Sequence, residues 1–564
     1  MEHMDKKDNS DSKERTFTGT LGGSGTMENT GAAGGGGGFE KERDAERIWR
    51  ELSMESRQEE PRLMKRLREN YGYVSGLCLL YGVIFAFCRY ENPNGITEPV
   101  LMCAMMGISY LLLKRIGVEV KKKTAAYAAG IALLGISTAM TCSGFLVFFN
   151  MAGSLLLFLA GMMHQFYEDE NWSFPAFIKN ITVICFTALG HVFCPFSHGY
   201  ACLAEARGEA AGSKRKAAAA VGIGILIAAG LLLVVFPTLL RSDMVFAEIF
   251  KNWFIDIEFG SAFVIGFMIL AGFTASYAFL SALCSRRLED VSLSGKQYNA
   301  LVGITFTGIL AGVYVLYAGV QVRYLFLRLG TLPEGVTYSS YAREGFFELL
   351  FVGIVNFILV AACVALFQEN RLLRGILTVI CGCTFIMIAS AFYRMALYVR
   401  TYHLTLLRIL VLWFLTVLAL IMGGVTVSIY RKTFPMFRYL AAVVGCGYIL
   451  FSFAKPDRLI AEYNLRHWEM VSVSDVQYIL YGLSDDAVPA IAGMDLTELE
   501  EDVSGGGDES GIEYRYGWTA DIRQEIRNHL YETADRYKEM PVRELNLAKL
   551  QARNAALKWL GENE

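Results

Sequence analysis

Long apolar runs separated by short polar segments occupy most of this chain, from about residue 73 to residue 453. About 20 consecutive apolar residues are enough to cross the hydrocarbon of a bilayer as a helix. The sequence therefore predicts an all-α, polytopic transmembrane helical bundle of about 11 to 12 spans. The predicted spans are 73–89, 96–113, 125–142, 145–165, 217–239, 260–283, 300–320, 345–367, 375–393, 404–429 and 435–453.

The segment 174–196 is long and apolar enough to cross the membrane as well. It is followed, however, by a basic stretch at 214–216, and Lys- and Arg-rich loops prefer the cytoplasm. If 174–196 crossed, this stretch and the earlier basic loop at 121–123 would lie on opposite sides. We therefore expect a re-entrant or interfacial segment, with a full crossing as the alternative.

Polar segments flank the apolar region on both sides. The N-terminal stretch is Gly-rich and polar and cannot bury enough surface to fold, which predicts a disordered head. After residue 453 hydropathy drops and helix-start signals appear, which predicts a short soluble helical tail. The expected organisation is a disordered head (1–38), a charged juxtamembrane helix (39–72), the transmembrane bundle (73–453), a helical tail segment (454–496), an acidic Gly-rich linker (497–510) and C-terminal helices (511–564).

Composition agrees with this pattern, because 54% of the residues are hydrophobic and only 19% are charged, against roughly 25% in a typical soluble domain. The net charge is −3, with the acidic excess in the tail. Surplus Lys and Arg in membrane loops require no nucleic acid, so the expected partner is the lipid bilayer. The basic loops of the first half predict a multi-pass cell-membrane protein with a cytoplasmic N-terminus. An odd number of spans then favours an extracytoplasmic tail, although the loops of the second half give almost no charge bias.

Ionisable residues concentrate where two of the spans begin, in the segments 338–350 and 393–408. Charged side chains at the edge of the hydrocarbon are costly unless paired or hydrated, so such a cluster indicates a candidate functional site. The alternative is a set of interfacial anchors, with arginines reaching water and tyrosines forming an aromatic belt. The candidates are Arg343, Glu344, Glu348, Arg394, Arg400, His403 and Arg408.

A second group of acids, Asp243 and Glu248, follows the predicted span 217–239. Carboxylates beside an apolar wall suit a cation path or a general acid. An amphipathic helix lying in the interface, with Trp253 as its anchor, explains the same pattern.

Several kinds of catalytic and cofactor site have no counterpart in this sequence. It holds no phosphate-binding Walker loop, no GxSxG, no kinase signature and no dinucleotide fingerprint, which disfavours ATP hydrolysis and serine-hydrolase chemistry. Its cysteines form no CxxC pair, so we expect neither a metal nor another cofactor. A membrane-embedded transferase with short motifs stays open, but a protein that is not an enzyme is favoured.

Several short motifs occur in a fixed order along the second half of the chain. They are Leu239-Leu-Arg-Ser-Asp-Met-Val-Phe246, Tyr341-Ala-Arg-Glu-Gly-Phe-Phe-Glu-Leu349, Tyr402-His-Leu-Thr-Leu-Leu-Arg408 preceded by Arg394 and Tyr398, Ala461-Glu-Tyr-Asn-Leu-Arg466, Asp475-Val-Gln-Tyr-Ile-Leu480 and Asp486-Ala-Val-Pro489. In this order they resemble the bacterial membrane proteins grouped as domain of unknown function 4173, which is related to domain 4153. The resemblance implies a bacterial polytopic membrane protein in which 454–496 belongs with the bundle, and it implies no activity. His403 stands where members of the family often have glycine.

Three functions remain open at this point. The first is movement or sensing of a small solute or ion, whose identity is unknown, at the polar cluster. The second is an envelope enzyme using Asp243, Glu248 or Glu344, which requires a carboxylate inside a cavity open to the bilayer. The third is a non-catalytic regulator or scaffold that binds a partner protein through its tail, with Trp468, Tyr478 and Trp518 on exposed faces.

Overall fold

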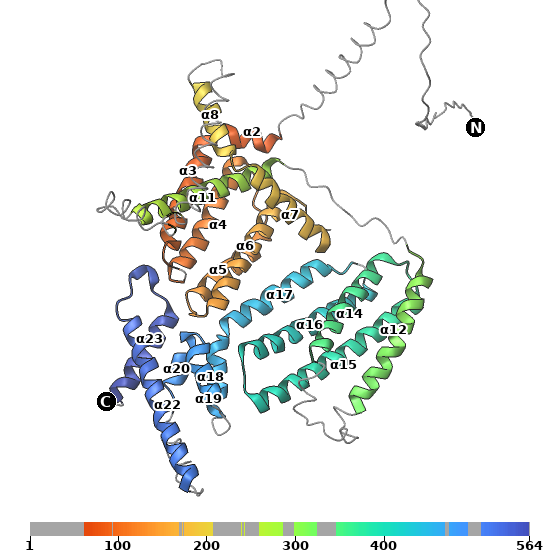
Figure 1. Ribbon diagram of the computed structural model, residues 1–564. Helices are drawn as coiled ribbons and strands as arrows, with labels where there is room; N and C mark the ends of the chain where they lie inside the picture. Colours follow the sequence, from red (N-terminus) through yellow and green to blue (C-terminus); the bar gives the residue numbers. More distant parts are fainter. Residues whose placement is uncertain are drawn as a thin grey trace, which may run out of the picture. The chain divides into compact units, whose positions relative to one another are not determined.

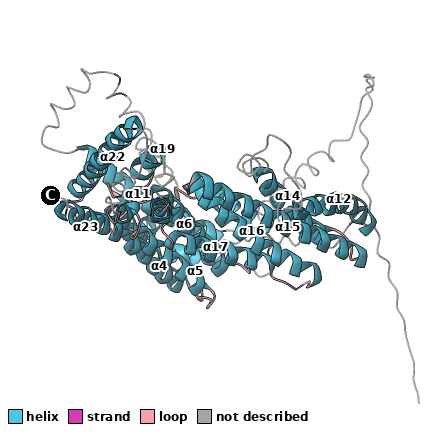
Figure 2. Cartoon of the chain, turned by 90° about the horizontal axis from the view of Figure 1, so that it is seen from below, coloured by secondary structure: helices cyan, strands magenta, loops and turns pink. Residues whose placement is uncertain are grey.

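In the parts of the chain that the computed structural model describes, the secondary structure is helical, with a single isolated β-bridge between Tyr298 and Phe367 (Figure 2). This confirms the all-α fold class. The described residues are 61–92, 94–168, 172, 174–206, 239, 242, 259–285, 298–323, 346–431, 433–467, 473–494 and 509–562. The predicted disordered head and most of the predicted juxtamembrane helix lie outside these ranges, as does the predicted span 217–239 except for Leu239.

Nine helices of the described residues are long and apolar enough to cross a membrane, or ten if one bent helix pair is a single span. Their number and hydropathy confirm a multi-pass membrane protein. These helices are α3 (Tyr71–Arg89), α4 (Thr97–Ile116), α6 (Gly144–Phe166), α11 (Phe259–Ser285), α12 (Ala300–Gln321), α14 (Phe346–Leu366), α15 (Arg371–Tyr402), α16 (Leu406–Tyr430) and α17 (Met436–Phe453).

Two predicted segments differ in detail from the structure. The doubtful segment 174–196 forms α7 (Phe174–Gly190) and α8 (Cys194–Ala206), which bend by 51° at their junction. That geometry fits either a broken span or a re-entrant loop. The predicted span 125–142 is the shorter helix α5 (Thr124–Thr138), because the residues after Thr138 turn toward α6.

A first group of helices packs around α11, which contacts α3 most extensively and also touches α7, α8 and α2 (Arg62–Glu69) (Figure 1). Two glycines allow α3 and α11 to approach closely. A Cβ on Gly82 would lie 2.4 Å from the carbonyl oxygen of Ile269, and a Cβ on Gly272 would lie 2.8 Å from the Cα of Gly82. Small residues at such a crossing let the two helix backbones touch directly, as is typical of membrane helices.

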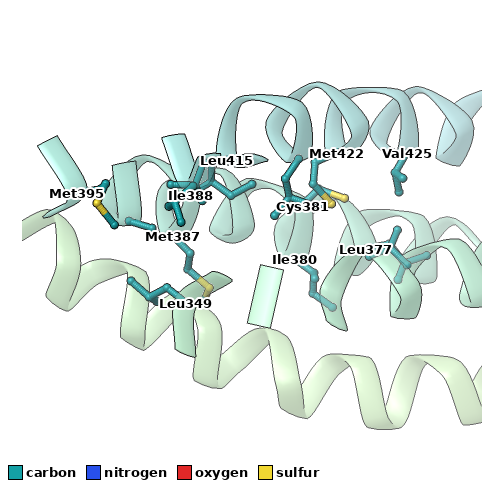
Figure 3. Close-up of a cluster of buried hydrophobic side chains, with 14 of the residues drawn as sticks. Leu349, Leu377, Ile380, Cys381, Met387, Ile388, Met395, Leu415, Met422 and Val425 are labelled. Atoms are coloured by element: carbon teal, nitrogen blue, oxygen red, sulfur yellow. The ribbon is translucent and has the colours of Figure 1, made fainter. Parts of the chain in front are cut away.

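A second group consists of α12, α14, α15 and α16, with α15 in contact with the other three. Figure 3 shows the apolar side chains between these helices, including Leu349 of α14, Met387 and Ile388 of α15, and Leu415 and Met422 of α16. All five are buried. Half of the apolar window of α15 is buried, the largest share among the candidate spans, so α15 is the central helix of this group.

Helix α17 contacts α16 of the second group and is held to α5 and α6 by a small polar network. The hydroxyls of Ser137 on α5 and Ser452 on α17 are 2.6 Å apart. Asn150 of α6 accepts hydrogen bonds from Ser452 (2.8 Å) and from the Tyr448 hydroxyl (2.9 Å). Because polar groups in a bilayer have no water to bind, these partners hold α17 against α5 and α6.

After α17 the chain folds into a small helical domain, hereafter the tail domain (residues 456–494 and 509–562). Its helices share one apolar core that includes Ile479, Leu480, Val488, Leu530 and Trp559. The stretches predicted as a tail segment and as C-terminal helices therefore fold together. Its elements are α18 (Pro456–Arg466), α19 (Val473–Gln477), a π-helical turn (Tyr478–Gly482), a 3-10 turn (Asp485–Ala487), α20 (Val488–Ile491), α22 (Glu509–Arg536), a second 3-10 turn (Val542–Glu544) and α23 (Leu547–Glu562).

Candidate functional site

Arg394 is a buried cation in a membrane-spanning helix. Arg394 lies on α15 and is only 5% exposed. Its Nη2 donates a hydrogen bond to the side-chain oxygen of Gln321 on α12 at 3.3 Å. The Ser390 hydroxyl donates to the same oxygen at 2.7 Å. A guanidinium is expensive to bury in a membrane span, which makes this position the strongest functional candidate among the predicted residues.

A second polar contact lies deeper along the same helices. The Tyr314 hydroxyl of α12 donates to the Asn356 side-chain oxygen of α14 at 2.7 Å, and the Asn356 amide donates to the Thr384 hydroxyl of α15 at 2.9 Å. Asn356 and Thr384 are fully buried. At about 1.5 Å per residue, Thr384 lies about 15 Å from Arg394 along α15. Polar side chains therefore line the α12–α14–α15 interface over about half of a bilayer's hydrocarbon thickness.

The other predicted cluster residues do not form one assembled group among the described residues. Glu348 is exposed in the first turn of α14, and Arg400 is exposed near the end of α15. Arg343 and Glu344 lie outside the described residues, as do Asp243 and Glu248. The hypothesis that carboxylates of the segment 338–350 meet Arg394 therefore stays a prediction.

Arg408 and His403 belong to the turn between α15 and α16. The Arg408 guanidinium donates to the carbonyl oxygens of Tyr402 and His403 and lies over the ring of Tyr398, 4.3 Å from its centre. His403 has a φ of +64°, a conformation that favours glycine. Arg408 thus satisfies the carbonyls that the end of α15 leaves open, which is a structural role.

The tail domain holds this same turn through a pair of hydrogen bonds that sequence reasoning missed. The Asn464 amide of α18 donates to the Leu404 carbonyl oxygen at 2.9 Å, and the Leu404 backbone N–H donates back to the Asn464 side-chain oxygen at 2.8 Å. The Leu406 N–H donates to the Tyr478 hydroxyl at 3.0 Å. The His403 ring lies 3.9 Å from the Asp475 carboxylate. The sequence motifs described above include Asn464, Tyr478 and Asp475. Membership in a motif could have marked these residues as functional candidates, but it did not reveal which residues they contact.

The tail domain also binds the loop between α5 and α6. The Asp486 carboxylate, only 3% exposed, accepts hydrogen bonds from the Thr141 hydroxyl (2.5 Å) and the Cys142 backbone N–H (2.9 Å). Burial raises the pKa of Asp486, while these two hydrogen bonds act against that rise. Asn546, just before α23, donates to the carbonyl oxygens of Thr141 (2.9 Å) and Thr138 (3.3 Å).

Backbone contacts extend the docking to the loop between α3 and α4. The Ile96 N–H donates to the Leu545 carbonyl oxygen at 2.7 Å, and Arg543 Nη2 donates to the Tyr90 carbonyl oxygen at 2.8 Å. On the other loop, the Leu547 N–H donates to the Ala139 carbonyl oxygen at 3.0 Å. The segment before α23 is therefore fixed to both loops at one end of the helices α3 to α6.

Helix α2 contacts the opposite end of the same helices. Arg66 Nη1 donates to the carbonyl oxygen of Ile116, the last residue of α4, at 3.3 Å. The Arg115 Nε donates to the side-chain oxygen of Asn70, which directly precedes α3, at 2.8 Å. The tail domain and α2 thus lie at opposite ends of α3 and α4, which are both long enough to span a membrane.

The fold and these contacts define the chain as a multi-pass, all-α membrane protein whose tail domain is joined to its helical bundle. A comparison with protein families matches residues 128–494 to Domain of unknown function (DUF4153), and the chain belongs to this family. The matched region includes Leu404, Asn464 and Asp486, whereas the helices α22 and α23 lie beyond it. No curated protein and no solved structure matches the chain. The relation to domain 4173 remains a resemblance carried by the motifs.

Proposed function

We propose that the protein binds a small polar solute or ion at the α12–α14–α15 interface and either moves it across the membrane or senses it. The observation that carries this proposal is Arg394, a 5% exposed arginine inside a candidate span. Buried ionisable residues in spans typically mark solute paths or binding sites. The guanidinium offers several fixed donors, so an anion or a carboxylate-bearing solute is the best chemical match.

The tail domain supports a role in sensing as well as in movement. It binds the α15–α16 turn at Leu404, two residues beyond the end of α15, and that helix end lies about 12 Å along α15 from Arg394 at 1.5 Å per residue. Any shift of α15 on solute binding therefore acts directly on the contacts of Asn464. A packed helix of this kind moves as a unit, which gives the solute site a mechanical connection to the tail domain.

The two alternative functions receive less support. The apolar groove between α4, α5 and α6 has no carboxylate in its lining, as an envelope enzyme with an acid or base would need. Tyr478, expected on an exposed face for a scaffold, instead has its hydroxyl bonded to Leu406. Trp468 lies outside the described residues.

We further propose the orientation of the protein in the cell membrane. The turn between α4 and α5 carries Lys121, Lys122 and Lys123, and Lys- and Arg-rich loops favour the cytoplasm. The tail domain is bound to the loops at the other end of α4 and α5, as Asp486 and Leu545 indicate. On this proposal the N-terminus is cytoplasmic and the tail domain is extracytoplasmic.

The solute site is tested by comparing Arg394→Gln with Arg400→Gln, which removes the same charge from an exposed position of the same helix. Purified protein in proteoliposomes is challenged with chloride, inorganic phosphate and lactate while charge movement on a solid-supported membrane is recorded. Because a hydrogen bond to a charged group contributes about 1.5–3 kcal/mol, Arg394→Gln is expected to weaken the response at least about tenfold. Arg400→Gln is expected to retain it. A response that is equal in wild type and Arg394→Gln, or absent for every anion in wild type, would contradict the proposal.

A further inference from the structure

A groove of about 300 Å³ opens between α4, α5 and α6, away from the proposed solute site. Its walls are almost entirely apolar, with Met106, Leu113, Ile131, Leu157 and Phe158 among the lining residues. Helix α5 lines the groove with its first two turns, where two small side chains leave space between α4 and α6. The small lining residues of α5 are Ala125 and Ala128.

The groove is shorter than one leaflet of the membrane is thick. Along α6 its lining runs from Leu157 to Gln165, a rise of about 12 Å at 1.5 Å per residue. Half of a bilayer's hydrocarbon is about 15 Å thick. The length and the apolar lining therefore match a lipid acyl chain from a single leaflet.

The mouth of the groove is polar and held in place by hydrogen bonds. Gln165, 5% exposed, accepts from the Lys121 backbone N–H at 3.0 Å and donates to the Thr124 hydroxyl. The Lys121 ammonium donates to the carbonyl oxygens of His164 (2.6 Å) and Tyr167 (2.8 Å). These contacts fix the α4–α5 turn beside the end of α6, so the mouth has a defined shape.

The rim of this mouth is basic. Lys122 lines the groove with an exposed side chain, and Lys121 lines it as well, with its ammonium bound to the two carbonyl oxygens named above. Between residues 114 and 123 the one carboxylate is that of Glu119. A cationic rim above an apolar groove is complementary to a lipid with an anionic headgroup, because each basic residue near the membrane surface contributes to binding such lipids.

We propose that this groove binds an anionic phospholipid of the leaflet at the Lys121 end, with one acyl chain between α4, α5 and α6 and the phosphate beside Lys122. The site is independent of Arg394 and of the proposed solute function. It gives the protein a preference for anionic lipid around the α4–α5 turn. Bound lipid would also fill the groove between α4, α5 and α6.

Native mass spectrometry of the full-length, detergent-solubilised protein tests this site. The protein is mixed with dioleoylphosphatidylglycerol or dioleoylphosphatidylcholine, and the first lipid adduct is quantified. Wild type is expected to prefer phosphatidylglycerol, and Lys122→Gln to lower that preference about fivefold, the effect of one basic residue near a membrane surface. Lys558→Gln, an exposed lysine of α23, is the control and is expected to leave the preference unchanged.

A second pair of variants tests the acyl-chain part of the site. Ala125→Phe fills the groove and is expected to reduce adducts of both lipids, whereas Ala126→Phe, at the neighbouring exposed position outside the lining, is expected to retain them. Circular dichroism checks that all variants remain folded. Unchanged preference in Lys122→Gln, undiminished adducts in folded Ala125→Phe, or complete displacement of phosphatidylglycerol by an equal concentration of inorganic phosphate would each overturn the proposal.

Discussion

Replacing Asn464 with alanine is expected to destabilise the contact between the tail domain and the α15–α16 turn by about 2–4 kcal/mol. The substitution leaves two buried backbone groups, the N–H and the carbonyl of Leu404, without partners. Asn464 is 2% exposed, and its amide binds both the N–H and the carbonyl oxygen of Leu404. Alanine removes the donor and the acceptor together. Water has little access to Leu404, which is 8% exposed, so the desolvation cost is not recovered.

The effect is measured as the rate of heat-induced unfolding in detergent, together with the rate of proteolysis at the α15–α16 turn. Rates are the proper measure because large membrane proteins often unfold irreversibly. Asn464→Asp keeps the acceptor for the Leu404 N–H and loses the donor, so an intermediate rate is expected. Gln551→Ala, at an exposed position whose side chain accepts a hydrogen bond from Lys455, is the control. If Asn464→Ala unfolds no faster than Gln551→Ala, Asn464 does not hold the turn.

Replacing Asp486 with alanine is expected to release the tail domain from the α5–α6 loop, at a cost of about 2–3 kcal/mol for the lost hydrogen bonds of a buried group. The carboxylate accepts from Thr141 and from the backbone of Cys142. Asp486→Asn preserves an acceptor for the Cys142 N–H, so its effect is expected to be smaller. Labelling of the half-buried Cys142 thiol reports the release, since the tail domain covers this loop. Equal labelling rates in wild type and Asp486→Ala would rule out this role for Asp486.

The burial of Asp486 is also expected to make the stability of the folded protein depend on pH, and it determines the sign of that dependence. Burial raises the pKa of Asp486 above its ordinary value of 3.8, although the hydrogen bonds from Thr141 and Cys142 oppose this rise. The folded state then holds the proton more tightly than the unfolded state. Stability therefore falls as the pH rises from about 3.8 to the raised pKa, and this contribution is constant at higher pH.

The pH prediction is checked by comparing the unfolding rates of wild type and Asp486→Asn across a pH series. The variant has no titrating group at this position, so the difference between the two curves isolates the carboxyl group. The expected difference changes only in the acidic window above 3.8. Parallel curves across that window would show that Asp486 titrates normally.

The sequence predicted the spans well where hydropathy alone determines a helix. The predicted 300–320 is α12 (Ala300–Gln321), and 435–453 is α17 (Met436–Phe453). For α15 the prediction of 375–393 ended too early, since the helix continues to Tyr402. The sequence analysis placed Arg394 at the edge of the hydrocarbon, but its burial against Gln321 allows the helix to continue past it.

The local pattern of hydrophobic and polar residues could not predict contacts between residues that are far apart in the sequence. Asp486 binds Thr141, 345 residues away, and Asn464 binds Leu404, 60 residues away. The motifs marked Asp486 and Asn464 as notable, yet a single sequence carries no signal that pairs them with their partners. The sequence predicted a short helical tail, and the family resemblance implied that 454–496 belongs with the bundle, but neither identified the two loops and the turn to which the tail domain is bound.

The central claim is that the tail domain and the α4–α5 turn lie on opposite sides of the membrane. Its most direct test places a single cysteine at Lys538 in the tail domain or at Glu119 in that turn, two exposed positions, in a background without the native cysteines. Intact cells are then labelled with a membrane-impermeant thiol reagent. We predict that Lys538→Cys reacts in intact cells and that Glu119→Cys reacts only after permeabilisation. Reaction of both cysteines under the same condition would contradict the account.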